Sequence, residues 1–185
     1  LLPELLRRFK ILYPRIEFKV TTGWSREIGN FVYNNDVHIG FIRGDYSWPD
    51  EKYLLFEEKM YVSYKNEFSL IDLPHIPRID YRNDHSVQQQ LDRWWNENYS
   101  VPPHIGMEVD KVDTCKEMVN KGLGYAFLPG MILGSNSDLC SREIAYRSGK
   151  PMVRRTWAIY HKENMDLKLV KAFFDFVTNV DFKAL

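Results

Sequence analysis

The sequence predicts an α/β protein built from two α/β units. Helical and strand-like patterns alternate four times within the first 42 of its 185 residues. A second alternating series begins near Arg78, and a strand pattern followed by a helix pattern closes the chain. Alternation with short connections is typical of α/β folds with parallel sheets. We therefore expect two lobes, each with a sheet covered by helices.

The first unit begins with leucine and phenylalanine at helical spacing over residues 2–12, and Pro14 ends this helix. Alternating apolar residues over 16–20 predict a strand. Ser25 is expected to cap the next helix. After a turn at Asn34-Asn35-Asp36, the apolar run His38 to Ile42 predicts a buried strand. These four elements are expected to form a unit with a parallel sheet.

The second unit repeats this order after the proline-containing segment 73–77. Trp94 and Trp95 mark the inward side of its first helix, and Gly122 is suited to a left-handed position after the next. The stretch 136–150 is polar and is expected to be irregular. The elements expected from residue 54 onward are strands over 54–64, 78–81, 105–109, 125–128 and 153–161, and helices over 85–99, 114–121 and 167–177.

The two lobes are expected to exchange the chain twice. We predict that residues 1–59 and 161–185 form lobe I and that residues 60–160 form lobe II. The crossings are expected near 60–64 and 154–160. Ligands of α/β proteins bind at the carboxyl ends of the strands and at domain junctions. The cleft between the lobes is therefore the predicted binding site.

Charge and composition exclude several classes of protein. Lysine plus arginine and aspartate plus glutamate both number 25, so the chain lacks the basic surplus typical of nucleic-acid binding. Its apolar runs are far shorter than the roughly 20 residues of a membrane span, and no secretory signal is recognisable. Cys115 and Cys140 have no metal-binding spacing and are expected to be free thiols. We expect a cytoplasmic protein without membrane contact.

Several segments, in order, carry a family resemblance. They are Leu1-Leu2-Pro3-Glu4-Leu5-Leu6-Arg7-Arg8-Phe9, Tyr13-Pro14-Arg15-Ile16, His38-Ile39-Gly40-Phe41-Ile42-Arg43-Gly44, Glu108-Val109-Asp110 and Met118-Val119-Asn120-Lys121-Gly122-Leu123-Gly124-Tyr125-Ala126-Phe127-Leu128-Pro129. With the closing strand and helix from Trp157 to Val177, they resemble the effector-binding domain of LysR-type transcriptional regulators. The resemblance covers nearly the whole chain.

The resemblance implies a type 2 periplasmic-binding-protein-like fold, with two Rossmann-like lobes joined by two crossover strands. It implies a small-molecule effector in the cleft and assembly into a homodimer or homotetramer. Promoter DNA would be bound only through an N-terminal winged helix-turn-helix domain, which this chain lacks. The family's first strand is also missing, so part of its effector site is expected to lie outside the chain.

Two arginines are the main candidates for effector binding. Arg43 directly follows the buried strand 38–42, and Arg154 and Arg155 begin the returning strand, where alternation points one of them inward. Guanidinium forks suit carboxylates, so we expect an organic anion, such as citrate, that bridges Arg43 and Arg154 and favours one lobe arrangement. The alternative is pairing with local carboxylates such as Asp45, Asp36 or Glu143.

Other candidates follow predicted strands. Tyr81 and Arg82 follow the first strand of lobe II, and Val109 and Asp110 follow its next strand. Thr22 follows the second predicted element of lobe I. Such strand-end positions favour a binding role. For aspartates there, turn or cap chemistry is the alternative.

Catalytic and metal-binding motifs are not recognisable. The five histidines are scattered, and no zinc-protease, nucleophile-elbow or phosphate-loop motif occurs. We therefore predict a sensor that is not an enzyme and has no metal and no cofactor. Two alternatives share the fold: a solute-binding protein of a transporter, and an enzyme on the same scaffold.

Overall fold

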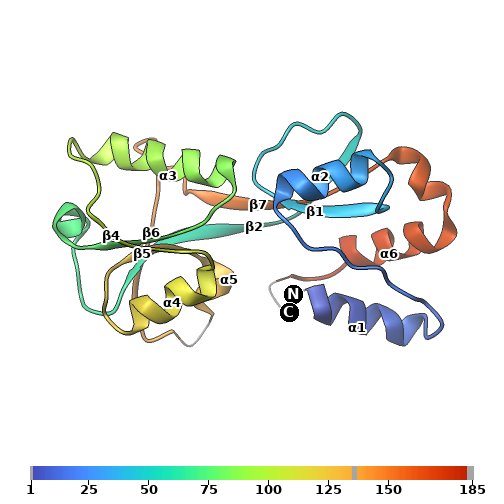
Figure 1. Cartoon of the computed structure of the whole chain (residues 1–185), viewed down its shortest axis with the longest axis horizontal. Helices are drawn as coiled ribbons and strands as arrows, with labels where there is room; N and C mark the ends of the chain where they lie inside the picture. The colour runs from blue at the N-terminus through green and yellow to red at the C-terminus, as the bar shows by residue number, and fades with distance from the viewer. Residues whose placement is uncertain (1, 135–136, 183–185) are drawn as a thin grey trace. The chain divides into compact units, whose positions relative to one another are not determined.

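A computed structural model describes residues 2–134 and 137–182 (Figure 1). The chain divides into two compact units, Leu1–Phe56 with Arg155–Leu185 (unit 1) and Glu57–Arg154 (unit 2). The predicted lobe boundaries, at 59–60 and 160–161, lie a few residues away and stay predictions. Leu1, Ser135, Asn136 and the last three residues, which the predicted ranges include, lie outside the described residues.

Unit 1 places helices on both faces of a short antiparallel strand pair. Phe41 lies opposite Ala158 in this pair. One helix packs over Gly40, where any side chain would collide with Val32 and Ile28, and two others cover the opposite face (Figure 1). The elements that contribute to unit 1 are α1 (Leu2–Leu12), α2 (Ser25–Tyr33), β1 (Ile39–Arg43), the start of β2 (Glu51–Tyr64), most of β7 (Val153–Tyr160), η2 (Lys162–Asp166) and α6 (Lys168–Thr178).

The strand predicted over 16–20 is wrong. The described structure assigns no strand there. The alternation has another cause, because Phe18 packs against the rings of Phe9 and Phe173, with centroids 6.2 and 6.1 Å away. With this segment outside any ladder, β1 pairs with β7, which runs antiparallel to it. The parallel sheet predicted for the first unit is therefore wrong as well.

Ser25 does not cap α2 from outside. It is the first helical residue, and Trp24 holds the cap position. The Glu27 carboxylate accepts the backbone N–H of Trp24 at 2.7 Å. The hydroxyl of Ser25 instead accepts the backbone N–H of Arg43 at 3.0 Å. This hydroxyl fixes the start of α2 against the end of β1.

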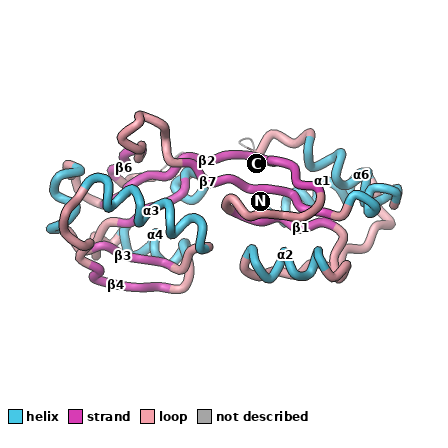
Figure 2. Tube along the Cα trace, turned by 90° about the horizontal axis from the view of Figure 1, so that it is seen from above, coloured by secondary structure: helices cyan, strands magenta, loops and turns pink. Residues whose placement is uncertain are grey.

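Unit 2 contains a parallel strand pair, as expected for an α/β unit. β3 (Arg78–Tyr81) and β4 (Ile105–Val109) run side by side (Figure 2), while β2 pairs antiparallel with β5 (Ala126–Pro129) and β6 (Cys140–Glu143). Helices α3 (His85–Asn98) and α4 (Val112–Asn120) lie on opposite sides of these strands (Figure 1). The remaining elements are η1 (Leu70–His75) and α5 (Gly130–Leu133).

Two apolar clusters hold unit 2 together. Trp94 and Trp95 of α3 are 2% and 3% exposed and pack with Phe127. On the α4 side, the cluster includes fully buried Cys115 and Val119. Burial of side chains of this size contributes about 1.5–3 kcal/mol each. The two helices that carry these residues are thereby fixed around β3 and β4.

The prediction for 136–150 is wrong in part, because β6 forms there on one edge of β2. Most of the other predicted elements agree within a few residues. Gly122 has a φ of 77°, the left-handed conformation predicted for it. A Cβ at Gly124 would lie 2.4 Å from the Pro77 carbonyl oxygen, so only glycine allows the chain to pass this close to the start of β3.

Candidate functional site

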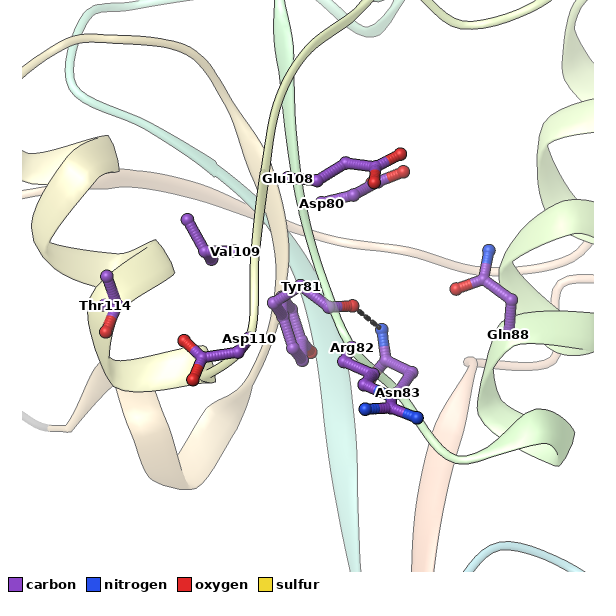
Figure 3. A pocket seen from close by; sticks show the side chains of 9 residues that line it. All are labelled: Asp80, Tyr81, Arg82, Asn83, Gln88, Glu108, Val109, Asp110 and Thr114. Carbon is purple, nitrogen blue, oxygen red and sulfur yellow. Dashed lines mark hydrogen bonds between the residues drawn. The ribbon is translucent and has the colours of Figure 1, made fainter.

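A cavity of about 850 Å³ opens in unit 2 at the carboxyl ends of β3 and β4 (Figure 3). Four of the predicted site residues line it: Tyr81, Arg82, Val109 and Asp110. Among the described residues, the lining consists of Asp80, Tyr81, Arg82, Asn83, Gln88, Glu108, Val109, Asp110 and Thr114. The four predicted residues come from two segments that are far apart in the sequence, and both follow the ends of predicted strands.

The register of the parallel pair explains this convergence. Asp80 lies opposite Glu108, and Tyr81 lies opposite Val109. The backbone N–H of Arg82 then donates to the Val109 carbonyl at 3.2 Å, one residue beyond β3. Since parallel strands end at the same edge, the residues that follow them share one opening.

Two helices begin beside this opening. Asp84 is the N-cap residue of α3, and Lys111 is that of α4. Gln88 projects from α3 toward the strand edge, while Thr114 lies in the first turn of α4 (Figure 3). The amino ends of helices carry partial positive charge and backbone N–H groups without helical partners. The opening therefore combines side-chain groups with two helix ends.

Asp80 pairs with the buried Arg78, which is not among the residues that line the cavity. Arg78 is 5% exposed, its Nε lies 2.6 Å from Oδ1 of Asp80, and its Nη2 donates to Oδ2 at 2.8 Å. The guanidinium lies 5.7 Å from the ring of Trp95 and 5.6 Å from that of Phe127. The charge-assisted hydrogen bond from Nη2 restrains the carboxylate, while Nε lies close to it without hydrogen-bond geometry. Arg78 also compensates its charge.

The other charged groups of the lining are Arg82, Glu108 and Asp110, all exposed. Figure 3 shows the Asp80 and Glu108 side chains next to each other, with Asp110 separate from them. Such a lining offers one cationic fork and several oxygen acceptors. It suits a small polar molecule that carries both an acidic group and hydrogen-bond donors.

Arg43 and Thr22 belong to unit 1 and lie outside this lining. Both are exposed. Arg43 ends β1, and its backbone N–H and carbonyl contact the Ser25 hydroxyl at 3.0 and 3.3 Å. Their contact with an effector stays a prediction.

Arg154 also lies in unit 2, but its side chain pairs with Glu58, and neither residue is in the cavity lining. Its guanidinium donates twice to Oε1 of Glu58, at 2.9 and 2.6 Å, and both side chains are 6% exposed. Arg155 pairs with Asp45 at 2.9 Å. Both arginines thus pair with carboxylates, the alternative to effector binding, and the Asp45 pair is one that the sequence suggested. An effector on Arg154 would compete with a buried ion pair, so its binding role stays a prediction without added support.

Five lining residues were not among the site residues predicted from the sequence: Asp80, Asn83, Gln88, Glu108 and Thr114. Asp80 and Glu108 are one step before the strand ends, and Gln88 and Thr114 lie early in the following helices. The sequence prediction considered only residues at and after the strand ends. Including the penultimate residue of each strand and the first turn of the following helix would have found most of these residues.

Within residues 2–134 and 137–182, no three or more histidine, cysteine, aspartate or glutamate side chains are grouped so that they could hold a metal ion. No helix there combines the length and the apolar character that crossing a membrane requires.

Comparison with known proteins identifies the fold and family. The Bacillus subtilis (strain 168) protein YraN, an uncharacterised HTH-type transcriptional regulator, is 38% identical over 176 residues, 95% of this chain and 61% of its own length. The Synechocystis PCC6803 CcmR regulatory domain in complex with 2-PG superposes with a TM-score of 0.77 at 16% identity, covering 96% of this chain and 89% of that one. For the BenM effector-binding domain with its effector benzoate, the TM-score is 0.72 at 14% identity, covering 95% and 83%.

The chain spans about three fifths of the length of its curated relatives YraN and YkuM. Its fold is that of LysR effector-binding domains, the two-lobed type 2 periplasmic-binding-protein-like architecture that the resemblance implied. The family model of the LysR substrate binding domain matches residues 1–181. The chain therefore belongs to the LysR substrate-binding domain family.

Proposed function

We propose that this chain is the effector-sensing part of a LysR-type transcription regulator and that its effector contacts the cavity at the end of β3 and β4. The observation that carries the proposal is the convergence of Tyr81, Arg82, Val109 and Asp110 on one opening of about 850 Å³. This volume is within the range of small-molecule sites. In the whole regulator, effector binding would alter DNA binding and transcription.

We propose an organic acid as the effector. Arg82 brings a guanidinium to the opening, and the starts of α3 and α4 favour negative charge. Glu108 and Asp110 would repel a polyanion such as citrate, so a single acidic group with neighbouring hydroxyl or amide donors fits better. Benzoate, the effector bound by the BenM domain, supports small monocarboxylic acids as probes.

The partners of the whole protein are part of the same proposal. A homodimer or homotetramer would hold its DNA-binding domains, and promoter DNA would be contacted by those domains alone. The balance of 25 basic and 25 acidic residues supports this division, because it offers DNA no surplus of positive charge. We place the regulator in the cytoplasm, without cofactor, metal or catalytic activity.

A thermal-shift screen tests the proposal. The panel is citrate, succinate, benzoate, 2-PG, phosphate, a set of amino acids, and glucose as a neutral compound. A ligand at 100 times its Kd stabilises the folded state by about 2.7 kcal/mol. For a chain of this size that corresponds to roughly 5–10 °C in Tm. We expect a shift with one or more acids.

Two variants assign the shift to the cavity. Arg82→Ala is expected to abolish it, and Arg93→Ala is the matched control, since Arg93 lies on α3 in an exposed pair with Glu97, outside the cavity lining. Acid binding that survives Arg82→Ala overturns the proposed contact. Failure of every acid, combined with a shift by glucose, overturns the effector class.

A further inference from the structure

The loop between β1 and β2 is held to the rest of unit 1 by several polar contacts, among them the backbone hydrogen bond from Gly44 to the Arg155 carbonyl at 2.9 Å. We call residues 44–50 the strap. The indole N–H of Trp48 donates to the Tyr160 carbonyl at 3.2 Å, and Asp45 pairs with Arg155 at 2.9 Å. At its end, Asp50 Oδ2 lies 2.9 Å from Nδ1 of His161. The strap directly follows Arg43.

His161 has an acceptor at each ring nitrogen. Nδ1 faces the Asp50 carboxylate, and Nε2 lies 3.3 Å from the Tyr33 carbonyl oxygen. Tyr33 is the last residue of α2, whose terminal carbonyls lack helical donors. A neutral imidazole donates one hydrogen bond, whereas an imidazolium donates two. Only the protonated ring satisfies both acceptors at once.

The surroundings favour that protonated form. The side chain of His161 is 17% exposed, and the negative end of α2 lies beside it. The hydrogen bond to Asp50 raises the pKa of His161, with smaller contributions from the Tyr33 carbonyl and Glu163. The same hydrogen bond to His161 lowers the pKa of Asp50, which also accepts the backbone N–H of Lys162 at 3.3 Å.

The other groups around this pair are aromatic or acidic. The ring of Trp48 lies 5.7 Å from that of His161, and the ring of Tyr33 lies 6.5 Å away. The backbone N–H groups of Glu51 and Lys162 donate to the Asp50 carboxylate, and the Glu51 charge acts on Tyr160. The charged groups that act on His161 are Asp50 of the strap and Glu163 of η2, both negative, while its partial burial opposes them.

We propose that His161 is a proton-operated clasp, which holds the end of the strap to the C-terminus of α2 when protonated and releases it when neutral. The released form keeps at most one of the two ring hydrogen bonds. The loss is local to unit 1 and leaves the pairing of β1 with β7 intact. Because the strap directly follows Arg43, a change in pH that releases the strap also acts on Arg43.

The direction of the pH effect follows from the two shifts. His161 has its pKa raised on folding, so its contribution is complete below the ordinary histidine value of about 6.5 and is lost as pH rises through the folded value. Asp50 has its pKa lowered, so its contribution is lost only as pH falls below about 4. The clasp is closed between these limits.

Two measurements on the chain test the clasp. The imidazole resonances of all five histidines are titrated from about pH 5 to about pH 9. Hydrogen exchange of the strap amides is compared between wild type and His161→Gln at each pH, which removes the intrinsic pH dependence of exchange. We expect several-fold stronger protection of the strap in wild type at the acidic end, and equal protection at the alkaline end.

Asp50→Asn is the partner variant, and His75→Gln, an exposed histidine of unit 2, is the control. Asp50→Asn is expected to shift the His161 titration to lower pH and to remove most of the protection difference. A His161 titration that is unchanged by Asp50→Asn overturns the pairing. A strap whose protection relative to His161→Gln is the same at every pH overturns the clasp, even if the pairing holds.

Discussion

Arg154 and Arg155 are neighbours in β7 and identical in chemistry, but they lie in different environments. Arg154 and its partner Glu58 are each 6% exposed, and the second oxygen of Glu58 accepts the backbone N–H of Met131 at 3.0 Å. Arg155 is 26% exposed, and its partner Asp45 is 48% exposed. Successive side chains of a strand point to opposite faces, which separates the two arginines.

The difference teaches that position on the strand, more than residue type, decides what an ion pair contributes. In the buried pair, each charge depends on the other because water is excluded. In the exposed pair, water and salt screen both charges. Three sets of substitutions and one titration can test this contrast between buried and exposed ion pairs.

Breaking the buried pair on one side is expected to have the largest effect. Glu58→Gln leaves the Arg154 guanidinium buried without a counter-charge, which costs about 3–5 kcal/mol. Urea unfolding measures the loss. Glu143→Gln is the control, because Glu143 pairs with Lys59 on the surface, where they are 37% and 51% exposed. A loss below about 1 kcal/mol would contradict the account of burial given above.

Removing both charges together is expected to restore much of that loss. The double variant Glu58→Leu with Arg154→Met replaces a buried ion pair by apolar side chains, which is often neutral or stabilising. The Met131 N–H then loses its acceptor, at about 1–3 kcal/mol. We expect a double variant more stable than either single one. A double variant as unstable as the sum of the single variants would show that the pair is not coupled.

Breaking the exposed pair is expected to change stability little. Asp45→Asn removes the partner of Arg155 at a cost of about 0–1 kcal/mol. The cost should shrink further when unfolding is repeated at high salt, because screening weakens the wild-type pair. If the loss matches that of Glu58→Gln, exposure does not distinguish the two arginines.

A further surface group is Glu4 on α1, whose side chain is 32% exposed and accepts hydrogen bonds from Arg7 and Arg8. These bonds, that from Arg7 first, lower its pKa to about 2. A carboxyl with a lowered pKa adds stability above its unfolded value of about 4.3, and loses it as pH falls through the folded value. Nuclear magnetic resonance titration at low and high salt should show the pKa rising with salt. A salt-independent value would argue against surface screening.

Much of the fold was accessible from the sequence because its helices have strong periodicity and its buried strands have apolar runs. β6 was not, since three of its four residues are exposed and only its pairing with β2 makes it a strand. The false strand at 16–20 shows the opposite error. Apolar and polar residues alternate in that segment, but Phe18 packs against the rings of Phe9 on α1 and Phe173 on α6 without any strand pairing.

The site was accessible only in part for a related reason. Strand ends are visible in a sequence, and they led to Tyr81, Arg82, Val109 and Asp110. The place of Asp80 beside Glu108 depends on the register between β3 and β4, which no local pattern encodes. The partner of Arg154 lies 96 residues away in the chain, so its engagement was not predictable from neighbouring residues.

Chemical labelling of the buried Cys115 can report local unfolding of the protein. The side chain is fully buried on α4, and its thiol points to the Ile79 carbonyl at 3.6 Å. Burial raises the pKa of this thiol to about 12, so the native protein holds it as the unreactive thiol form. Alkylation by a maleimide or iodoacetamide needs both access and thiolate. The rate at which Cys115 is labelled, read by mass spectrometry, therefore counts the openings of the α4–β3 contact in a population that otherwise looks folded.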